Sequence, residues 1–169
     1  MEKSIRQEGE AGMPTRHSAA PELAAYLRER FGLPQTDLRR YSPLTLAFIG
    51  DDVYDLIVRT ILVERGNAPV NRLNGQARHL VSAVAQSRMM ETLEPLLTPE
   101  EAAVYKRGKN AKSATVSKNA PRTDYRTATG LEALCGYLYL AGRTERLTDL
   151  LEAGLAAAGE LTERNGEKA

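Results

Sequence analysis

A proline-free stretch from residue 44 to residue 64 constrains the fold more than any other feature of this chain. Ser42 and Pro43 precede it as an N-cap residue followed by a proline in the first helical turn, and Gly66 and Pro69 mark its end. Its apolar residues lie on nearly every side of a helix: Leu44, Leu46, Ala47, Phe48, Ile49, Val53, Leu56, Ile57, Ile61 and Leu62. Such a helix is buried on most of its surface. The sequence therefore predicts a long central helix.

The rest of the chain also has helical patterns, and no stretch predicts a strand of useful length. Helices are expected at about 22–31, 70–93, 99–108, 124–140 and 144–158, with a polar loop at 109–123. Residues 1–20 are interpreted as a flexible tail, 21–40 as an accessory helix and linker, 41–160 as the main domain and 161–169 as a second tail. The fold class expected is all-α, with a single domain.

Composition excludes several classes of protein. The single cysteine, Cys135, allows no intrachain disulfide, and with only two histidines there is little to build a zinc site. No apolar stretch is long enough for a membrane helix, and the polar N-terminus does not resemble a signal peptide. A cytoplasmic protein with no membrane partner is expected. The formal net charge is only +1, so any binding to nucleic acid must depend on local clusters of charge.

Two carboxylates occur in apolar surroundings. Asp51 follows Gly50 in the long helix, and Glu132 lies in a run of otherwise uncharged residues, one turn before Gly136. An unpaired carboxylate in an apolar interior costs several kcal/mol. Helices thinned by glycine can cross closely, so both acids are expected at one site, where oxygen ligands suit Mg²⁺ or Mn²⁺.

A structural ion pair explains the same two acids equally well at this point. The arginines that are candidates for such a pair are Arg59, Arg78, Arg88 and Arg126. Asp52 and Asp55 are more simply charges on the exposed face of the helix, although Asp55 is a secondary candidate for the site. The residues alone leave the metal site and the ion pair open.

A basic cluster follows the fourth predicted helix. Residues 106–113 hold four cations and no acid, and the candidate RNA-binding residues in and after this cluster are Lys106, Arg107, Lys109, Asn110, Lys112, Ser113, Lys118 and Arg122. Lysine and arginine with amide and hydroxyl donors suit phosphate contacts. The cluster contains no aromatic residue for base stacking, which favours recognition of an RNA duplex by its backbone and shape. The alternative is a solvated surface loop.

Three segments resemble the catalytic domain of the ribonuclease III family. Residues 44–54 (LTLAFIGDDVY) are similar to its signature helix, and residues 129–139 (TGLEALCGYLY) to its second acidic helix. Val81-Ser82 resembles a third, weaker motif. The order and spacing of the three match, and the resemblance covers about residues 42–158. The basic cluster, and a chain too short for a double-stranded-RNA-binding domain, resemble the Mini-III branch of the family.

The resemblance implies a homodimeric, metal-dependent endoribonuclease with its catalytic domain at 41–160. Asp51 and Glu132 would be the catalytic and metal-binding residues, Thr129 would assist through a water, and Mg²⁺ would be the cofactor, with Mn²⁺ as a substitute. The substrate would be double-stranded RNA, in particular a base-paired stalk of precursor large-subunit (23S) ribosomal RNA, cut to 5′-phosphate and 3′-hydroxyl ends.

The chain departs from full-length ribonuclease III at three positions. Leu44, Ala47 and Thr129 stand where that larger enzyme has acids, a thinner set that Mini-III proteins share. A non-catalytic RNA-binding or ribosome-associated homodimer on the same fold is therefore the main alternative. A helical interaction module is a weaker one, and it predicts an arginine against Asp51 and no metal.

Overall fold

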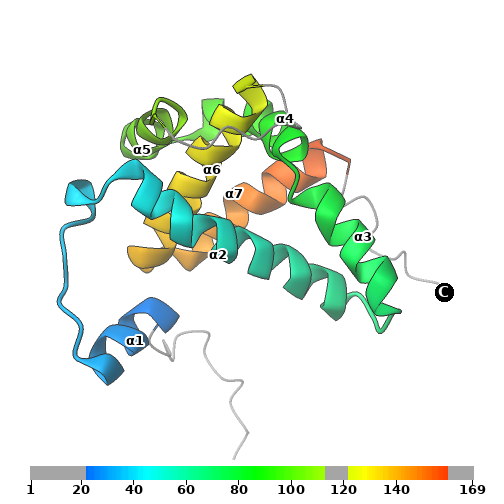
Figure 1. The fold of residues 1–169 in the computed structure, drawn as a ribbon, viewed down its shortest axis with the longest axis horizontal. Coiled ribbons are helices and arrows are strands. Elements are labelled where there is room, and N and C mark those ends of the chain that lie inside the picture. Colours follow the sequence, from blue (N-terminus) through cyan, green and yellow to red (C-terminus); the bar gives the residue numbers. More distant parts are fainter. Residues whose placement is uncertain (1–21, 113–121, 160–169) are drawn as a thin grey trace, which may run out of the picture.

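The computed structural model describes residues 22–112 and 122–159, and in these ranges all regular elements are helical. Figure 1 shows their arrangement. The α-helices are α1 (Leu23–Phe31), α2 (Pro43–Glu64), α3 (Val70–Leu80), α4 (Ala83–Leu93), α5 (Pro99–Lys109), α6 (Arg122–Leu140) and α7 (Thr144–Ala157). Two short 3₁₀ helices, η1 (Leu38–Arg40) and η2 (Glu94–Leu96), connect them. The all-α prediction is confirmed.

The predicted helix starts are formed by local hydrogen bonds. The Ser42 hydroxyl accepts the backbone N–H of Thr45 at 3.1 Å, and Pro43 occupies the first turn of α2. At the start of α5, Thr98 and Glu101 form a reciprocal capping box, in which each side chain accepts the other residue's backbone N–H. Caps of this kind satisfy N–H groups that have no partner inside the helix. They fix where α2 and α5 begin.

The prediction of one continuous helix over 70–93 was wrong. The segment forms two helices, α3 and α4, with a break at Val81-Ser82. Ser82 adopts an extended conformation and its hydroxyl accepts the N–H of Ala85, which makes it the N-cap of α4. The apolar pattern continues through the break, so periodicity gave no sign of it. The serine's preference for an N-cap position decides the local structure.

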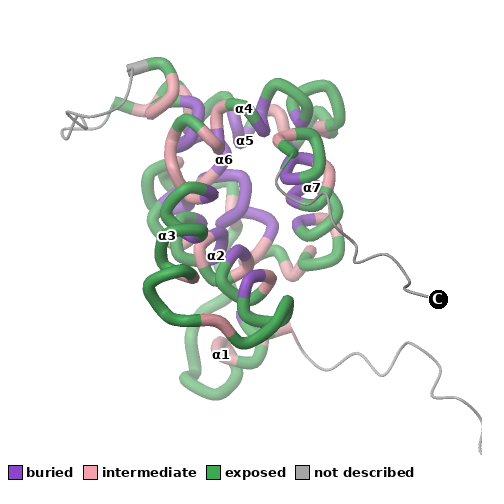
Figure 2. The backbone as a smooth tube through the Cα atoms, turned by 90° about the vertical axis from the view of Figure 1, so that its right-hand side faces the viewer, coloured by how far each residue is buried: buried purple, intermediate pink, exposed green. Residues whose placement is uncertain are grey.

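The core lies around α6, which packs against α2, α4, α5 and α7. In Figure 2 the buried segments run through the middle of the bundle, and α3 and α1 lie toward the outside. The side chains that are almost fully buried include Tyr54, Tyr105, Met89, Leu131 and Leu138. Cys135 is also fully buried, as expected for a small apolar residue. The helix that carries Glu132 is thus the central support of the domain.

The α2 helix is less buried in the single chain than its composition predicts. Phe48 is 77% exposed, and Leu44, Leu56 and Val63 are also exposed. The prediction of a helix buried on most sides was therefore wrong for the isolated chain. The buried side of α2 faces α6, and its other side presents an apolar surface.

The remaining predictions about the chain concern its ends and the membrane. The tails predicted at 1–20 and 161–169 lie outside the described residues. In the described part of the chain, no helix combines the length and hydrophobicity needed to cross a membrane.

Candidate active site

The α2 and α6 helices touch through their backbones at Gly50 and Gly136. A Cβ atom added to Gly50 would lie 1.7 Å from the carbonyl oxygen of Glu132, and one added to Gly136 would lie 2.0 Å from that of Leu46. Real Cβ atoms are never this close to a backbone oxygen, so only glycine allows the contact. The predicted close crossing of the two helices is confirmed.

The crossing places the two candidate acids at one pocket. Asp51 and Glu132, together with Thr129, line a shallow pocket of about 320 Å³. Asp51 comes from α2, and the other two come from α6, one turn apart. Asp51 and Thr129 are 78 positions apart in the sequence, and the helix crossing brings them to one site. The convergence expected from the glycine pattern is confirmed.

The walls of this pocket include the three positions at which the chain departs from the full-length enzyme. The pocket's other walls are formed by Leu44, Ala47, Phe48, Asp52 and Tyr125. Leu44, Ala47 and Thr129 are the positions where the resemblance placed further acids, and all three line the pocket. The Thr129 hydroxyl donates to the carbonyl of Tyr125 at 3.0 Å. At the three positions where the resemblance implies acids, the pocket therefore presents two apolar side chains and one hydroxyl.

Burial and repulsion by neighbouring carboxylates disfavour the charged forms of both acids. Glu132 is half-buried, and its burial raises its pKa to about 7, with the nearby charge of Asp51 contributing. Asp51 is exposed at the pocket rim, where the prediction had it buried. Partial loss of solvent still raises its pKa, and the charges of Asp52 and Asp55 add to this. Such a site attracts a cation, because a cation relieves the repulsion.

The ion-pair alternative is contradicted by the positions of the cations. In residues 22–112 and 123–159, no arginine or lysine forms a salt bridge with Asp51 or Glu132. Arg59 pairs instead with Asp55 at 2.7 Å, so Asp55 does not join the site. Arg126 donates to the carbonyl of Lys109 and to the amide oxygen of Asn110. Among the cations that the structure describes, none neutralises either acid.

The donor set is small. Within the described ranges, no group of three or more histidine, cysteine, aspartate or glutamate side chains is placed to hold a metal ion. Two carboxylates at an open pocket still fit Mg²⁺, which keeps several waters and commonly takes only one or two protein carboxylates. The residues that are able to hold a divalent cation here are Asp51 and Glu132.

The match to known families agrees with this site. The ribonuclease III domain family matches residues 44–143, which include both acids and the helix crossing. The chain belongs to the ribonuclease III family. It is 43% identical over 130 residues to the Mini-ribonuclease 3 of Enterococcus faecalis, with 76% of this chain and 98% of that protein covered. It is 39% identical over 143 residues to the Mini-ribonuclease 3 of Clostridium tetani, with 84% and 93% covered.

A solved structure also resembles this ribonuclease III domain. A crystal structure of a protein from Fusobacterium nucleatum superimposes with a TM-score of 0.67 at 31% identity, over 75% of this chain and 96% of that one. The fold and the sequence matches together identify the chain as an endoribonuclease of the Mini-III branch.

The basic cluster of this ribonuclease III domain begins in the last turn of α5. Lys106 and Lys112 are exposed, and the Lys109 ammonium lies over the Tyr105 ring at 5.6 Å. Arg107, predicted as an RNA contact, donates to the Tyr41 carbonyl at 2.8 Å and so also ties α5 to the segment before α2. Ser113 and Lys118 lie outside the described residues, and so does the side chain of Arg122.

The end of α5 is held close to the pocket. Arg126, which anchors Lys109 and Asn110, follows the pocket residue Tyr125 on α6. A second glycine contact brings the helices together, because a Cβ added to Gly108 would lie 2.9 Å from the Cα of Gly130. The described part of the basic cluster is thus fixed next to the carboxylates.

Sequence reasoning missed one residue of the site, Gln86 on α4. Its side chain is 1% exposed, and its amide nitrogen donates to Glu132 Oε1 at 3.4 Å. The available signal was a polar amide between the apolar positions of α4, directly after the Val81-Ser82 motif. It was missed because the break between α3 and α4, which turns Gln86 toward α6, was not predicted.

Proposed function

We propose that this enzyme is a divalent-metal-dependent endoribonuclease that cuts double-stranded RNA, with Asp51 and Glu132 as its catalytic metal ligands. The observation that carries the proposal is the meeting of two carboxylates, without a neutralising cation among the described residues, at one open pocket. Mg²⁺ is the proposed cofactor and Mn²⁺ its substitute.

The proposed chemistry is hydrolysis of a phosphodiester to 5′-phosphate and 3′-hydroxyl ends. A bound divalent cation would supply a nucleophilic water at neutral pH and charge stabilisation for the phosphoryl group. Asp51 and Glu132 would bind the cation, and Thr129 at the same pocket would help through a bound water. The apolar side chains of Leu44 and Ala47 would restrict bulk water beside the reacting phosphate.

The duplex substrate is supported by the position and composition of the basic cluster. Lys106 in the last turn of α5 and Lys112 just after it are exposed, and Arg126, which follows the pocket residue Tyr125, donates to the carbonyl of Lys109 between them. Cations at that place suit RNA phosphates on either side of the cut. By the family resemblance, the natural substrate is a stalk of precursor large-subunit ribosomal RNA, processed in the cytoplasm.

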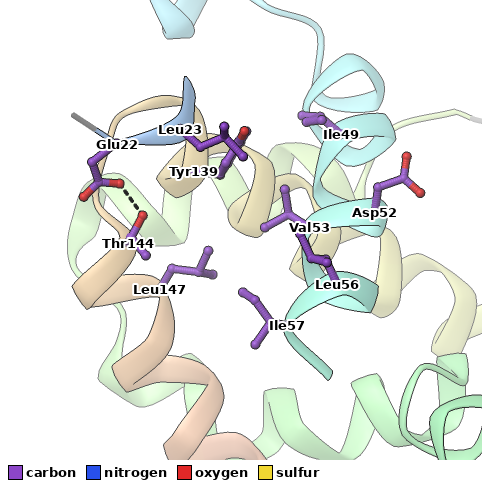
Figure 3. A pocket seen from close by; sticks show the side chains of 10 residues that line it. All are labelled: Glu22, Leu23, Ile49, Asp52, Val53, Leu56, Ile57, Tyr139, Thr144 and Leu147. Carbon is purple, nitrogen blue, oxygen red and sulfur yellow. Dashed lines mark hydrogen bonds between the residues drawn. The ribbon is translucent and has the colours of Figure 1, made fainter. Parts of the chain in front are cut away.

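The apolar face of α2 supports a homodimer. An exposed phenylalanine leaves about 1.5–3 kcal/mol of burial energy unused, and Phe48 is 77% exposed. Beside it on α2 lies a mainly apolar pocket of about 490 Å³, whose lining includes Ile49, Val53 and Leu56 (Figure 3). A protruding and a receiving surface on the same helix suit a two-fold axis, because each copy then offers both to the other.

Cleavage of matched double-stranded and single-stranded RNAs, with and without Mg²⁺, tests the proposed function. We expect Mg²⁺-dependent cutting of the duplex, products that a 5′-phosphate-dependent exonuclease degrades, and little cutting of the single strand. Tight duplex binding without cleavage at any divalent metal concentration would overturn the proposal and favour the non-catalytic RNA-binding homodimer.

A further inference from the structure

Gln86 is a buried polar side chain that the proposed metal site does not yet explain. It lies on α4 among apolar residues such as Met89 and Met90, with 1% of its surface exposed. A buried amide costs free energy unless it is fully hydrogen-bonded. The oxygen Oε1 of Gln86 is one of two buried side-chain polar atoms without a hydrogen-bond partner in the described part of the chain. A residue with such a cost is unfavourable for packing alone.

The nitrogen of the same amide is fully used. Gln86 Nε2 donates to the backbone carbonyl of Val81 at 3.2 Å and to Glu132 Oε1 at 3.4 Å. An amide nitrogen has two hydrogens, so both are assigned. The opposite orientation of the amide is unfavourable, since it would set the amide oxygen against the Val81 carbonyl oxygen and the charged Glu132 carboxylate. The orientation of Gln86 is therefore fixed by its surroundings.

The break between α3 and α4 provides this fixed point. Val81 caps α3, and Ser82 starts α4, so Gln86 lies one turn after the start of α4 and reaches back to the Val81 carbonyl. One hydrogen bond thus ties Gln86 to the break, and the other crosses from α4 to the carboxylate on α6. The break, the amide and Glu132 form a connected chain of contacts.

The chemistry of the amide matters as much as its position. An arginine or lysine at position 86 would neutralise Glu132 and compete with a metal ion. An acid at this position would repel the Glu132 carboxylate. A neutral amide donor restricts the rotation of a carboxylate and leaves its charge available. Hydrogen-bond donors to metal ligands commonly have this role.

We infer that Gln86 is a positioning residue, which holds the Glu132 carboxylate in the orientation needed to bind the divalent cation together with Asp51. This inference rests on the proposed function, since it requires the two carboxylates to be metal ligands. It adds a residue from α4, outside the two acidic helices. It also gives the Val81-Ser82 motif a functional reason, because the break at that motif orients Gln86.

The alternative is that Gln86 only stabilises the junction of α3 and α4 through Val81. The variant Gln86→Met separates the two roles, because methionine is similar in length and flexible but donates no hydrogen bond. Met90→Leu is the matched control, as it changes a buried side chain one turn further along α4 at nearly constant volume. A purely structural role predicts a change in stability without a specific change in metal affinity.

The test is the dissociation constant for Mn²⁺, measured by titration calorimetry on the full chain without RNA. We expect Gln86→Met to bind Mn²⁺ about 10-fold more weakly, Met90→Leu to bind as the wild type does, and Asp51→Asn to lose binding. Wild-type affinity in Gln86→Met would overturn the inference and leave the metal site intact. Wild-type affinity in Asp51→Asn would instead overturn the proposed metal site, and with it the role of Gln86.

A second measurement remains decisive if Gln86→Met does not fold. In crystals of the wild-type protein soaked in Mn²⁺, Gln86 Nε2 should stay within hydrogen-bond distance of a Glu132 carboxylate oxygen while that side chain contacts the metal. A Glu132 carboxylate bound to Mn²⁺ with Gln86 beyond hydrogen-bond distance would overturn the inference.

Discussion

Gly50 of α2 lies directly against the backbone carbonyl of Glu132 on α6. Glu132 therefore supplies both the backbone contact between the two helices and the second acid of the site. A Cβ at position 50 would be 1.7 Å from that carbonyl oxygen, and neither backbone can move without moving the carboxylates. The geometry of the pocket therefore depends on the absence of a side chain at this position.

Replacing Gly50 with alanine should destabilise the protein by about 3 kcal/mol or more, because a methyl group must separate two packed helices. Gly75→Ala is the matched control, since its Cβ would meet nothing within 4 Å on α3. That control should stabilise the protein by about 0.5–1 kcal/mol through better helix propensity. Urea unfolding of both variants measures the difference, and equal stabilities for Gly50→Ala and the wild type would contradict the packing described here.

Much of the fold follows from the sequence because its signals are local. Ser42-Pro43 and Thr98-Pro99 predicted the starts of α2 and α5, and the glycines at 50 and 136 predicted the helix crossing. The break at Ser82 was not predicted, since the apolar stripe continues across it although serine is a preferred N-cap residue.

The sequence predicted the two acids of the site, but not the residues that surround them. Gln86 reaches Glu132 only through the tertiary packing of α4 on α6, which no sequence period shows. Arg107 was assigned to RNA from its place in a basic run, but it also holds the Tyr41 carbonyl, a contact between residues 66 positions apart. Clustered charge in the sequence predicts a basic surface. The tertiary structure decides which of its cations also form hydrogen bonds within the protein.

The stability of the metal-free protein should fall as pH rises from about 5 to about 8. Glu132 has a pKa raised from 4.5 to about 7 by burial and by Asp51, so the folded state binds its proton more tightly than the unfolded state does. Losing that proton costs at most about 3 kcal/mol at the upper end of the range. The raised pKa of Asp51 acts in the same direction.

Glu132→Gln should flatten this pH dependence, measured by urea unfolding in the presence of a chelator. The pKa of Glu101 is lowered by its hydrogen bonds with Arg146, so the stability that this pair contributes is lost only as pH falls below the ordinary glutamate range. It therefore stays constant between pH of about 5 and about 8. The raised pKa of Glu132 would be contradicted if the unfolding free energy of the wild type did not fall with pH more steeply than that of Glu132→Gln.

The double variant Lys109→Ala with Lys112→Ala should weaken duplex RNA binding and reduce its salt dependence. Each lost phosphate contact lowers the slope of log affinity against log salt by about 1. Fluorescence anisotropy at several salt concentrations gives the slope. Arg30→Ala, on the exposed end of α1, serves as a control of equal charge change per residue. An unchanged slope in the double variant would remove these lysines from the RNA interface.

Phe48→Asp should convert the proposed homodimer to a monomer, because burying a charge in an apolar interface without a partner is unfavourable. Analytical ultracentrifugation measures the change, and Val63→Asp, at an exposed apolar residue near the other end of α2, is the comparison. A dimer of unchanged dissociation constant in Phe48→Asp would place the interface elsewhere.

The most direct test of the account is the rate of duplex RNA cleavage in Mg²⁺ by Asp51→Asn and by Glu132→Gln, each shown to be folded and in the same oligomeric state as the wild type. Both variants should be slower by at least about 100-fold, since losing a metal ligand should cost more than losing a residue that only supports one. Cleavage at close to the wild-type rate by either variant would contradict the assignment of these two carboxylates as the active site.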